Sequence, residues 1–134
     1  MFAKLLSPLL RHYMQVQPNL LLVPMPVRTG ALKKRGFDHG RKLALAVQRQ
    51  TGVSVAKNLL SFTRDARDQR NLSLEGRASN LAGSMKAEST HLPVVLIDDV
   101  VTTGATLTEA RRALEHRGVR VLGFITIAET LAKT

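Results

Sequence analysis

The chain has 134 residues, 44% hydrophobic and 22% charged, a balance typical of a globular protein and not of a disordered or membrane-embedded one. This length predicts a single domain over residues 1–134. The absence of cysteine excludes disulfides and thiolate metal sites and agrees with a reducing cytoplasm, where we expect the protein to reside. The four histidines lie far apart in sequence, so no metal site built from protein ligands is predicted.

Residues 2–14 carry apolar side chains on one helical face, which predicts a helix that covers the core. Ser7 is expected to cap this helix with Pro8 in its first turn, or the helix kinks at Pro8. The same proline interrupts the apolar run before Arg11, so a secretory signal is not predicted. No stretch of the sequence is apolar for long enough to span a bilayer, and membrane insertion is not expected.

The next predicted elements are a strand, a basic loop and a helix. Leu20–Val23 is apolar and is followed by Pro24, which predicts a buried strand that ends before the proline. The loop over residues 27–39 is rich in Lys and Arg and leads into a helix predicted over Gly40–Gln50. A strand followed by a basic loop and a helix is suited to bind pyrophosphate, because the negative charges of this ligand require guanidinium and backbone donors at the carboxyl end of a strand.

Val53–Leu60 predicts a second strand with a polar interruption at Lys57-Asn58. Residues 62–92 then form an interval that is long for a compact domain and is expected to be functional or disordered. We predict a mobile loop over this interval, which would close over a substrate and exclude water. A surface helix around Leu72–Asn80 is the alternative.

Four apolar residues, Val94–Ile97, predict a strand buried on both faces, which Asp98 and Asp99 end. A run of small residues leads into a helix over Leu107–Arg117, and Val119–Ile127 predicts a last strand. Alternating strands and helices indicate an α/β fold, a Rossmann-like parallel sheet with helices on both faces and ligands at the carboxyl ends of the strands.

The segment that leads into the predicted helix over Leu107–Arg117 contains the candidate ligand-binding residues. Backbone N–H groups at a helix N-terminus, with threonine hydroxyls and a glycine that lets the backbone approach, form a cradle for a phosphate. Asp98 and Asp99 are hydrogen-bond acceptors that suit a diol, and a phosphate beside a diol describes ribose 5-phosphate. An ordinary helix start with capping acids is the competing interpretation.

All thirteen positions of Val94–Thr106 resemble the phosphoribosyl-pyrophosphate (PRPP) signature of type I phosphoribosyltransferases. The resemblance implies the type I phosphoribosyltransferase fold, with transfer of the 5-phosphoribosyl group to an unknown nucleophilic acceptor and release of pyrophosphate. It also implies Mg²⁺ as cofactor, bound mainly through PRPP. Asp99 is the expected catalytic residue, and Arg28 and Arg35 are expected to face the pyrophosphate. The residues expected to bind PRPP are Asp98, Asp99, Val100, Thr102, Thr103, Gly104, Ala105 and Thr106.

Pro24-Met25-Pro26, followed nine residues later by Arg35-Gly36-Phe37, resembles the ComF group of that superfamily, which includes competence and DNA-utilisation proteins. The group usually continues with Asn-Gln, where this chain has Asp38-His39. A second motif keeps its spacing within the long interval, with Ala66 and Met85 where the group prefers Thr and Phe. Its matching residues are Arg64, Gln69, Leu72, Ser73, Arg77 and Asn80. The group's amino-terminal zinc-finger-like segment has no counterpart here, and we expect a short or truncated form.

The net charge of +10 leaves a second functional class open. A global basic excess often indicates a polyanionic partner, so a non-catalytic accessory protein of DNA uptake or utilisation is the alternative. The chain has one tyrosine, four phenylalanines and no tryptophan, so few side chains can stack on bases, and this alternative ranks second. Dinucleotide-binding and Walker A patterns are absent from the sequence. The sequence predicts neither the acceptor nor the oligomeric state.

Overall fold

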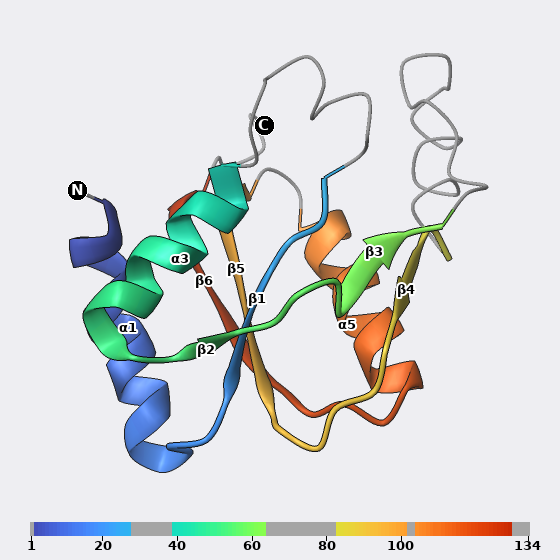
Figure 1. The fold of residues 1–134 in the computed structure, drawn as a ribbon. Helices are drawn as coiled ribbons and strands as arrows, with labels where there is room; N and C mark the ends of the chain where they lie inside the picture. Colours follow the sequence, from blue (N-terminus) through green and yellow to red (C-terminus); the bar gives the residue numbers. More distant parts are fainter. Residues whose placement is uncertain (1, 28–38, 64–82, 102–103, 130–134) are drawn as a thin grey trace.

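The computed structural model describes residues 2–27, 39–63, 83–101 and 104–129. Four parallel strands form one sheet in the order β2-β1-β5-β6. Helices α1 and α3 cover one face of this sheet and α5 the other (Figure 1). The elements are α1 (Phe2–Val16), β1 (Leu21–Pro24), α3 (His39–Thr51), β2 (Ser54–Val55), β3 (Leu60–Phe62), β4 (Met85–Ala87), β5 (Val94–Val101), α5 (Ala105–His116) and β6 (Val121–Glu129). The predicted parallel sheet with helices on both faces is confirmed.

The core consists of two layers separated by the sheet. Side chains alternate along β5, so that Val95 and Ile97 pack with α1 and α3 while Val94 and Leu96 pack with α5. All four of these side chains are buried. The apolar run that predicted a strand buried on both faces therefore occupies the centre of the molecule.

Strand β2 is only two residues long, which leaves the end of β1 open on one side. β1 pairs with β2 through Leu21 and Leu22 only, whereas its ladder with β5 continues to Pro24. The Met25 N–H donates to the Ile97 carbonyl of β5 at 3.1 Å, so the nitrogen of Pro24 faces the opposite side, where β2 has already ended. The prediction that the strand ends before Pro24 was wrong, because no ladder bond is required of that nitrogen.

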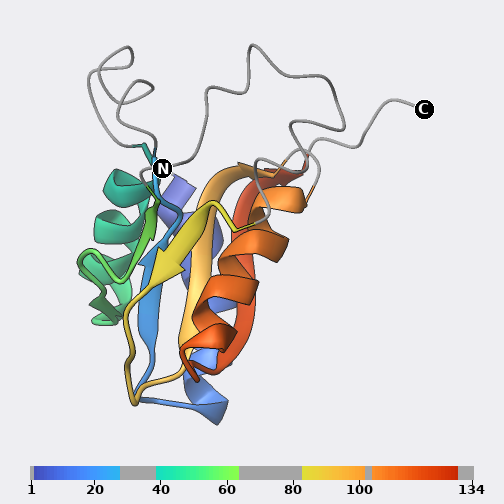
Figure 2. The same cartoon turned by 90° about the vertical axis from the view of Figure 1, so that its right-hand side faces the viewer.

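The single strand predicted over Val53–Leu60 was also wrong. The chain turns at Asn58, whose φ is 56°, and two separate strands result. β2 joins the parallel sheet, whereas β3 pairs antiparallel with β4 in a small second sheet on the α5 side (Figure 2). Asparagine tolerates this left-handed backbone, so the polar interruption seen in the sequence is a turn between two sheets.

The first helix begins at Phe2, so Pro8 lies inside it and Ser7 is not its cap. Ser7 is buried, and its hydroxyl lies 2.8 Å from the Gln50 Oε1 atom near the end of α3. Among the helices that the structure describes, none combines the length and apolarity needed to cross a bilayer.

The interval 62–92 is bounded by paired backbone. Phe62 belongs to β3, and Met85–Ala87, inside the interval, forms β4. Phe62 lies opposite Met85, and the Thr63 N–H donates to the Ser84 carbonyl at 2.7 Å. Residues 64–82, with the alternative helix around Leu72–Asn80, lie outside the described residues, and the mobile loop stays a prediction.

Candidate functional site

The strand that carries the two aspartates is longer than predicted. β5 continues through Asp98 and Asp99 to Val101, because β6 extends beside it to Glu129 and the ladder continues to the end of both strands. Asp98 lies opposite Thr126 in this ladder, and its side chain is half-buried. The prediction that the two acids end the strand was wrong. They lie in the half of β5 that leads to its carboxyl end.

The helix that follows begins at a glycine with a left-handed backbone. Gly104 has φ 80°, and its carbonyl accepts both the backbone N–H of Thr108, at 2.9 Å, and the hydroxyl of Thr108, at 3.0 Å. The first turn of α5 contains no acidic residue. The N–H groups of a first helical turn point out of the N-terminus, and the helix dipole favours an anion there.

The structure describes part of the predicted PRPP site. Asp98 lies in the second half of β5, Gly104 is the N-cap residue of α5, and Ala105 and Thr106 begin the helix, with Thr106 half-buried. The backbones of Asp99 and Val100 belong to β5. Thr102, Thr103, Arg28 and Arg35 lie outside the described residues, so their predicted roles stay predictions.

A cleft of about 200 Å³ lies at the carboxyl end of β1. It occupies the side of β1 that the short β2 leaves open, between the segment that follows the strand and β3. Arg41, in the first turn of α3, contributes a cation to its wall. The lining residues are Val23, Pro24, Met25, Pro26, Val27, Arg41, Ala56, Asn58, Leu59, Leu60, Ser61 and Phe62. The cleft therefore adjoins Val27, after which the predicted pyrophosphate loop begins.

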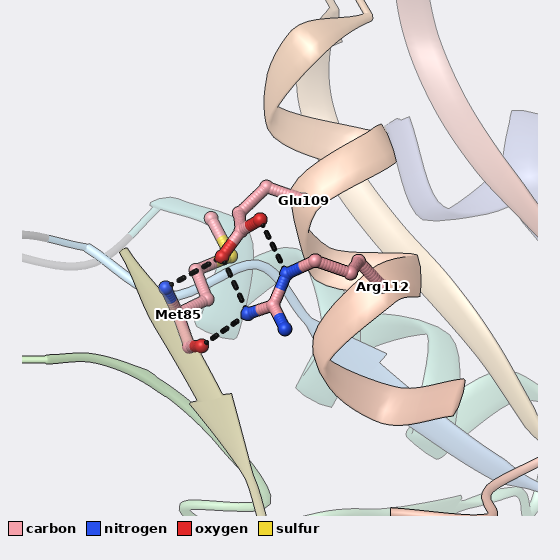
Figure 3. A network of polar contacts seen from close by, with 3 residues as sticks. All are labelled: Met85, Glu109 and Arg112. Atoms are coloured by element: carbon pink, nitrogen blue, oxygen red, sulfur yellow. Dashed lines mark hydrogen bonds and ion pairs between the residues drawn. The ribbon is translucent and has the colours of Figure 1, made fainter. Parts of the chain in front are cut away.

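Two charged side chains of α5 bind the backbone of β4 (Figure 3). Glu109, which is 4% exposed, accepts the Met85 N–H at 2.8 Å through Oε2. Arg112 donates from Nε to Glu109 Oε1 at 2.7 Å and from Nη2 to Glu109 Oε2 at 2.8 Å. The same Nη2 donates to the Met85 carbonyl at 2.9 Å. We call this arrangement of Glu109, Arg112 and Met85 the α5–β4 clamp.

The clamp keeps Glu109 ionised. Burial raises the pKa of this carboxyl, but the hydrogen bond from Arg112 and those from the backbones of Met85 and Gly83 lower it by more. The net result is a pKa of Glu109 below its ordinary value. The same hydrogen bond raises the pKa of Arg112 above its ordinary value.

Within the described residues, no three side chains of the His, Cys, Asp or Glu type come together as a metal site. Asp98, in the second half of β5, provides the one carboxylate among the described side chains of the predicted site, and carboxylate oxygens are ligands that Mg²⁺ prefers.

A profile of the phosphoribosyl transferase domain family matches residues 31–134 of this chain. The chain belongs to this family. The match includes β5, the start of α5 and the clamp, so these parts of the site belong to a phosphoribosyl transferase domain.

Three curated proteins illustrate its relatives. Competence protein F of Haemophilus influenzae is 29% identical over 73% of this chain and 45% of its own length. Adenine phosphoribosyltransferase of Polynucleobacter asymbioticus is 32% identical over 73% of this chain and 55% of its own. DNA utilization protein YhgH of Salmonella typhi is 28% identical over 82% and 49%. The similarity to the competence and DNA-utilisation group is thus confirmed, and the chain spans about half the length of these relatives.

Solved structures show the same fold. Adenine phosphoribosyltransferase of Saccharomyces cerevisiae matches 96% of this chain and 68% of its own, with a TM-score of 0.56 at 13% identity. Hypoxanthine phosphoribosyltransferase of Staphylococcus aureus matches 93% and 59%, with a TM-score of 0.56 at 16% identity. The predicted type I phosphoribosyltransferase fold is confirmed.

Sequence reasoning missed the clamp in this phosphoribosyl transferase domain. The sequence does hold a signal, because Glu109 lies on the same helical face as the buried Ala110 and Ala113. A carboxylate on an apolar face requires a partner, and Arg112 is one turn away. The contact with Met85, which is 24 residues distant, has no local signal.

Proposed function

We propose that this domain binds PRPP at the carboxyl ends of β5 and β1 and transfers its 5-phosphoribosyl group to a nucleophilic acceptor. The observation that carries the proposal is the junction of β5 and α5. Asp98 is half-buried and lies in the second half of β5. Gly104, which has a left-handed backbone, is the N-cap residue of α5, and the first turn of this helix has no acidic side chain. This junction lies within the segment that matches the family.

The start of α5 would hold the 5-phosphate. Helical N–H groups and the helix dipole favour an anion at this end, and the hydroxyls of Thr102, Thr103 and Thr106 add donors. Gly104 has no side chain, and no atom of the described residues other than its chain neighbours lies within 4 Å of the position that a β-carbon would take there. A phosphate can therefore approach the backbone closely.

The two aspartates would bind the ribose. Their oxygens accept hydrogen bonds from the two ring hydroxyls, and Asp99 is our candidate for the catalytic residue. Arg28 and Arg35 would face the pyrophosphate next to the cleft at the end of β1. In the reaction, the acceptor atom forms a bond to the anomeric carbon, the bond from that carbon to pyrophosphate breaks, and pyrophosphate leaves with the electron pair. These basic side chains stabilise the charge of the leaving group.

Mg²⁺ would enter this site mainly with PRPP. Carboxylate oxygens and phosphates suit this ion, and Asp98 and Asp99 would hold its waters. When bound, the ion neutralises charge on the pyrophosphate and orients it. The cytoplasmic location remains part of the proposal.

Calorimetry with PRPP and Mg²⁺ tests the binding proposal. We expect wild-type protein to bind, and Asp98→Asn combined with Asp99→Asn to abolish binding. Glu115→Gln is the control for loss of a carboxylate away from the site: it removes one negative charge, where the double variant removes two, and it lies near the far end of α5, in an exposed pair with Arg111. Undiminished affinity in the double variant would refute the site.

Turnover requires a separate measurement. The protein is incubated with PRPP, Mg²⁺ and a panel of bases and amines while pyrophosphate release is followed. Release that depends on one acceptor identifies the acceptor class. Binding without release for any acceptor would favour a non-catalytic protein that uses PRPP as a ligand.

The second candidate function is an accessory role in DNA uptake or utilisation. The net charge of +10 and the similarity to competence protein F and DNA utilization protein YhgH favour it. Binding of single-stranded DNA should then weaken steeply with salt, with a slope of about −0.7 per phosphate contact in a plot of log affinity against log salt. A flat salt response, or no binding at low salt, would contradict this role.

A further inference from the structure

The backbone of Met85 lies on the edge of β4 that faces away from β3. The Thr63 N–H donates to Ser84 and the Glu88 N–H donates to Leu59, so Ser84 and Glu88 face the partner strand. Because these groups alternate along an antiparallel strand, the N–H and C=O of Met85 point to the opposite side. That side is covered by α5 (Figure 3).

The α5–β4 clamp satisfies both backbone groups of Met85. Met85 is 2% exposed, so its N–H or C=O group would destabilise the folded protein by the free energy of its desolvation if it had no hydrogen-bond partner. Glu109 accepts the N–H and Arg112 donates to the carbonyl, while the two side chains bind each other. A carboxylate and a guanidinium thus take the place that a third strand would occupy beside β4.

The clamp also connects two parts of the proposed PRPP site. Glu109 is four residues after Ala105, so it lies about 6 Å along the helix axis from the start of α5. On the other side of β4, Phe62 lies opposite Met85 and lines the cleft at the end of β1. The same two side chains therefore hold the wall of this cleft against the helix that would bind the 5-phosphate.

We infer that Glu109 and Arg112 are positioning residues of the phosphoribosyl site, which fix the β3–β4 sheet relative to the start of α5. This inference rests on the proposed function. PRPP carries phosphates at both ends of its ribose, and it gains full affinity only when the groups that meet the two ends are held at a fixed separation. Neither residue needs to touch the ligand.

Calorimetry with PRPP and Mg²⁺ on four variants tests the inference. Glu109→Gln and Arg112→Gln break the clamp, whereas Arg111→Gln and Glu115→Gln change the exposed pair on the same helix and serve as controls. We expect the dissociation constant to rise about tenfold to a hundredfold in the first two variants, the loss that a small misplacement causes. The controls should bind as wild type.

The stoichiometry separates positioning from folding. A purely structural role reduces the number of binding-competent molecules and leaves the dissociation constant of the folded ones unchanged. Positioning raises the dissociation constant at unchanged stoichiometry. Hydrogen exchange at the Met85 amide should accelerate in Glu109→Gln and not in Glu115→Gln. If Glu109→Gln does not fold, Arg112→Lys, which keeps the charge but not the forked contact, should show an intermediate affinity.

The outcomes distinguish the two proposals. If the wild-type protein does not bind PRPP, the proposed function and this inference are both wrong. If it binds and the folded clamp variants bind equally well, only the inference is wrong. Reduced stoichiometry with an unchanged dissociation constant also contradicts it.

Discussion

Gly104 and Gly118 stand at the two ends of α5 with the same left-handed backbone, φ 80° and φ 77°. At either position, no atom of the described residues other than the chain neighbours lies within 4 Å of a β-carbon, so the strain of a substitution is that of the backbone. Gly118 belongs to a C-terminal motif in which its N–H donates to Glu115 at 2.9 Å and the Val119 N–H donates to Leu114 at 3.0 Å. The two positions share a positive φ and differ in their distance from the proposed phosphate site.

This equivalence predicts a separation of stability from binding. Gly104→Ala and Gly118→Ala should each lower the free energy of unfolding by about 1–2 kcal/mol, the cost of a left-handed backbone for a residue with a side chain. Only Gly104→Ala should weaken PRPP binding, because its backbone is expected to contact the phosphate. Urea denaturation and calorimetry measure the two effects. Equal affinity in both variants would remove Gly104 from the site.

The two ion pairs of α5 should differ in strength. Glu109 is 4% exposed and binds Arg112 and the Met85 N–H, whereas the side chains of Arg111 and Glu115 are 63% and 50% exposed. A double-mutant cycle on Glu109 and Arg112 should give a coupling free energy above about 1 kcal/mol, because a buried carboxylate loses its partner. The cycle on Arg111 and Glu115 should give about 0.3–0.5 kcal/mol. Equal couplings would show that the clamp contributes no more than a surface pair.

Stability in acid should depend on Glu109. Its pKa in the folded protein lies below its ordinary value of 4.5, so the unfolded chain binds the proton more readily. The stabilisation from this carboxylate is therefore complete above that ordinary value and is lost as the pH falls below it toward the folded pKa. The difference in unfolding free energy between wild type and Glu109→Gln should shrink as the pH falls below 4.5 toward the pKa of Glu109 in the folded protein. Urea denaturation at several pH values measures this difference, and a constant difference would contradict the role of Glu109.

A close contact between α1 and β6 gives a test of the fold itself. The Tyr13 ring lies against the backbone of Gly123, where a β-carbon would collide with the hydroxyl and lie 2.8 Å from Cζ. Gly123→Ala should destabilise the protein by about 1–3 kcal/mol through overpacking. The cost should decrease in a Tyr13→Phe background and fall further with Tyr13→Ala. Thermal unfolding of the series measures it, and an unchanged cost in all three backgrounds would place the ring elsewhere.

The sequence by itself predicted the β5–α5 unit and the parallel sheet. Val94–Ile97 is apolar at every position, and the start and end of α5 are marked by residues within a few positions of Gly104 and Gly118. Such signals are local, because strand burial and helix termini depend on near neighbours in the chain. The phosphate site is a prediction of the same local kind, since its residues are consecutive or nearly so in the sequence, and it stays a prediction.

Only the tertiary structure decided the features that join distant segments. It divided Val53–Leu60 between two sheets, allowed Pro24 in a central strand, and placed Met85 against Glu109. The physical reason is that the sequence does not specify which segment pairs with a given strand edge. Pro24 is tolerated because β2 ends before it. Glu109 is buried because it binds the edge of β4 that faces away from β3.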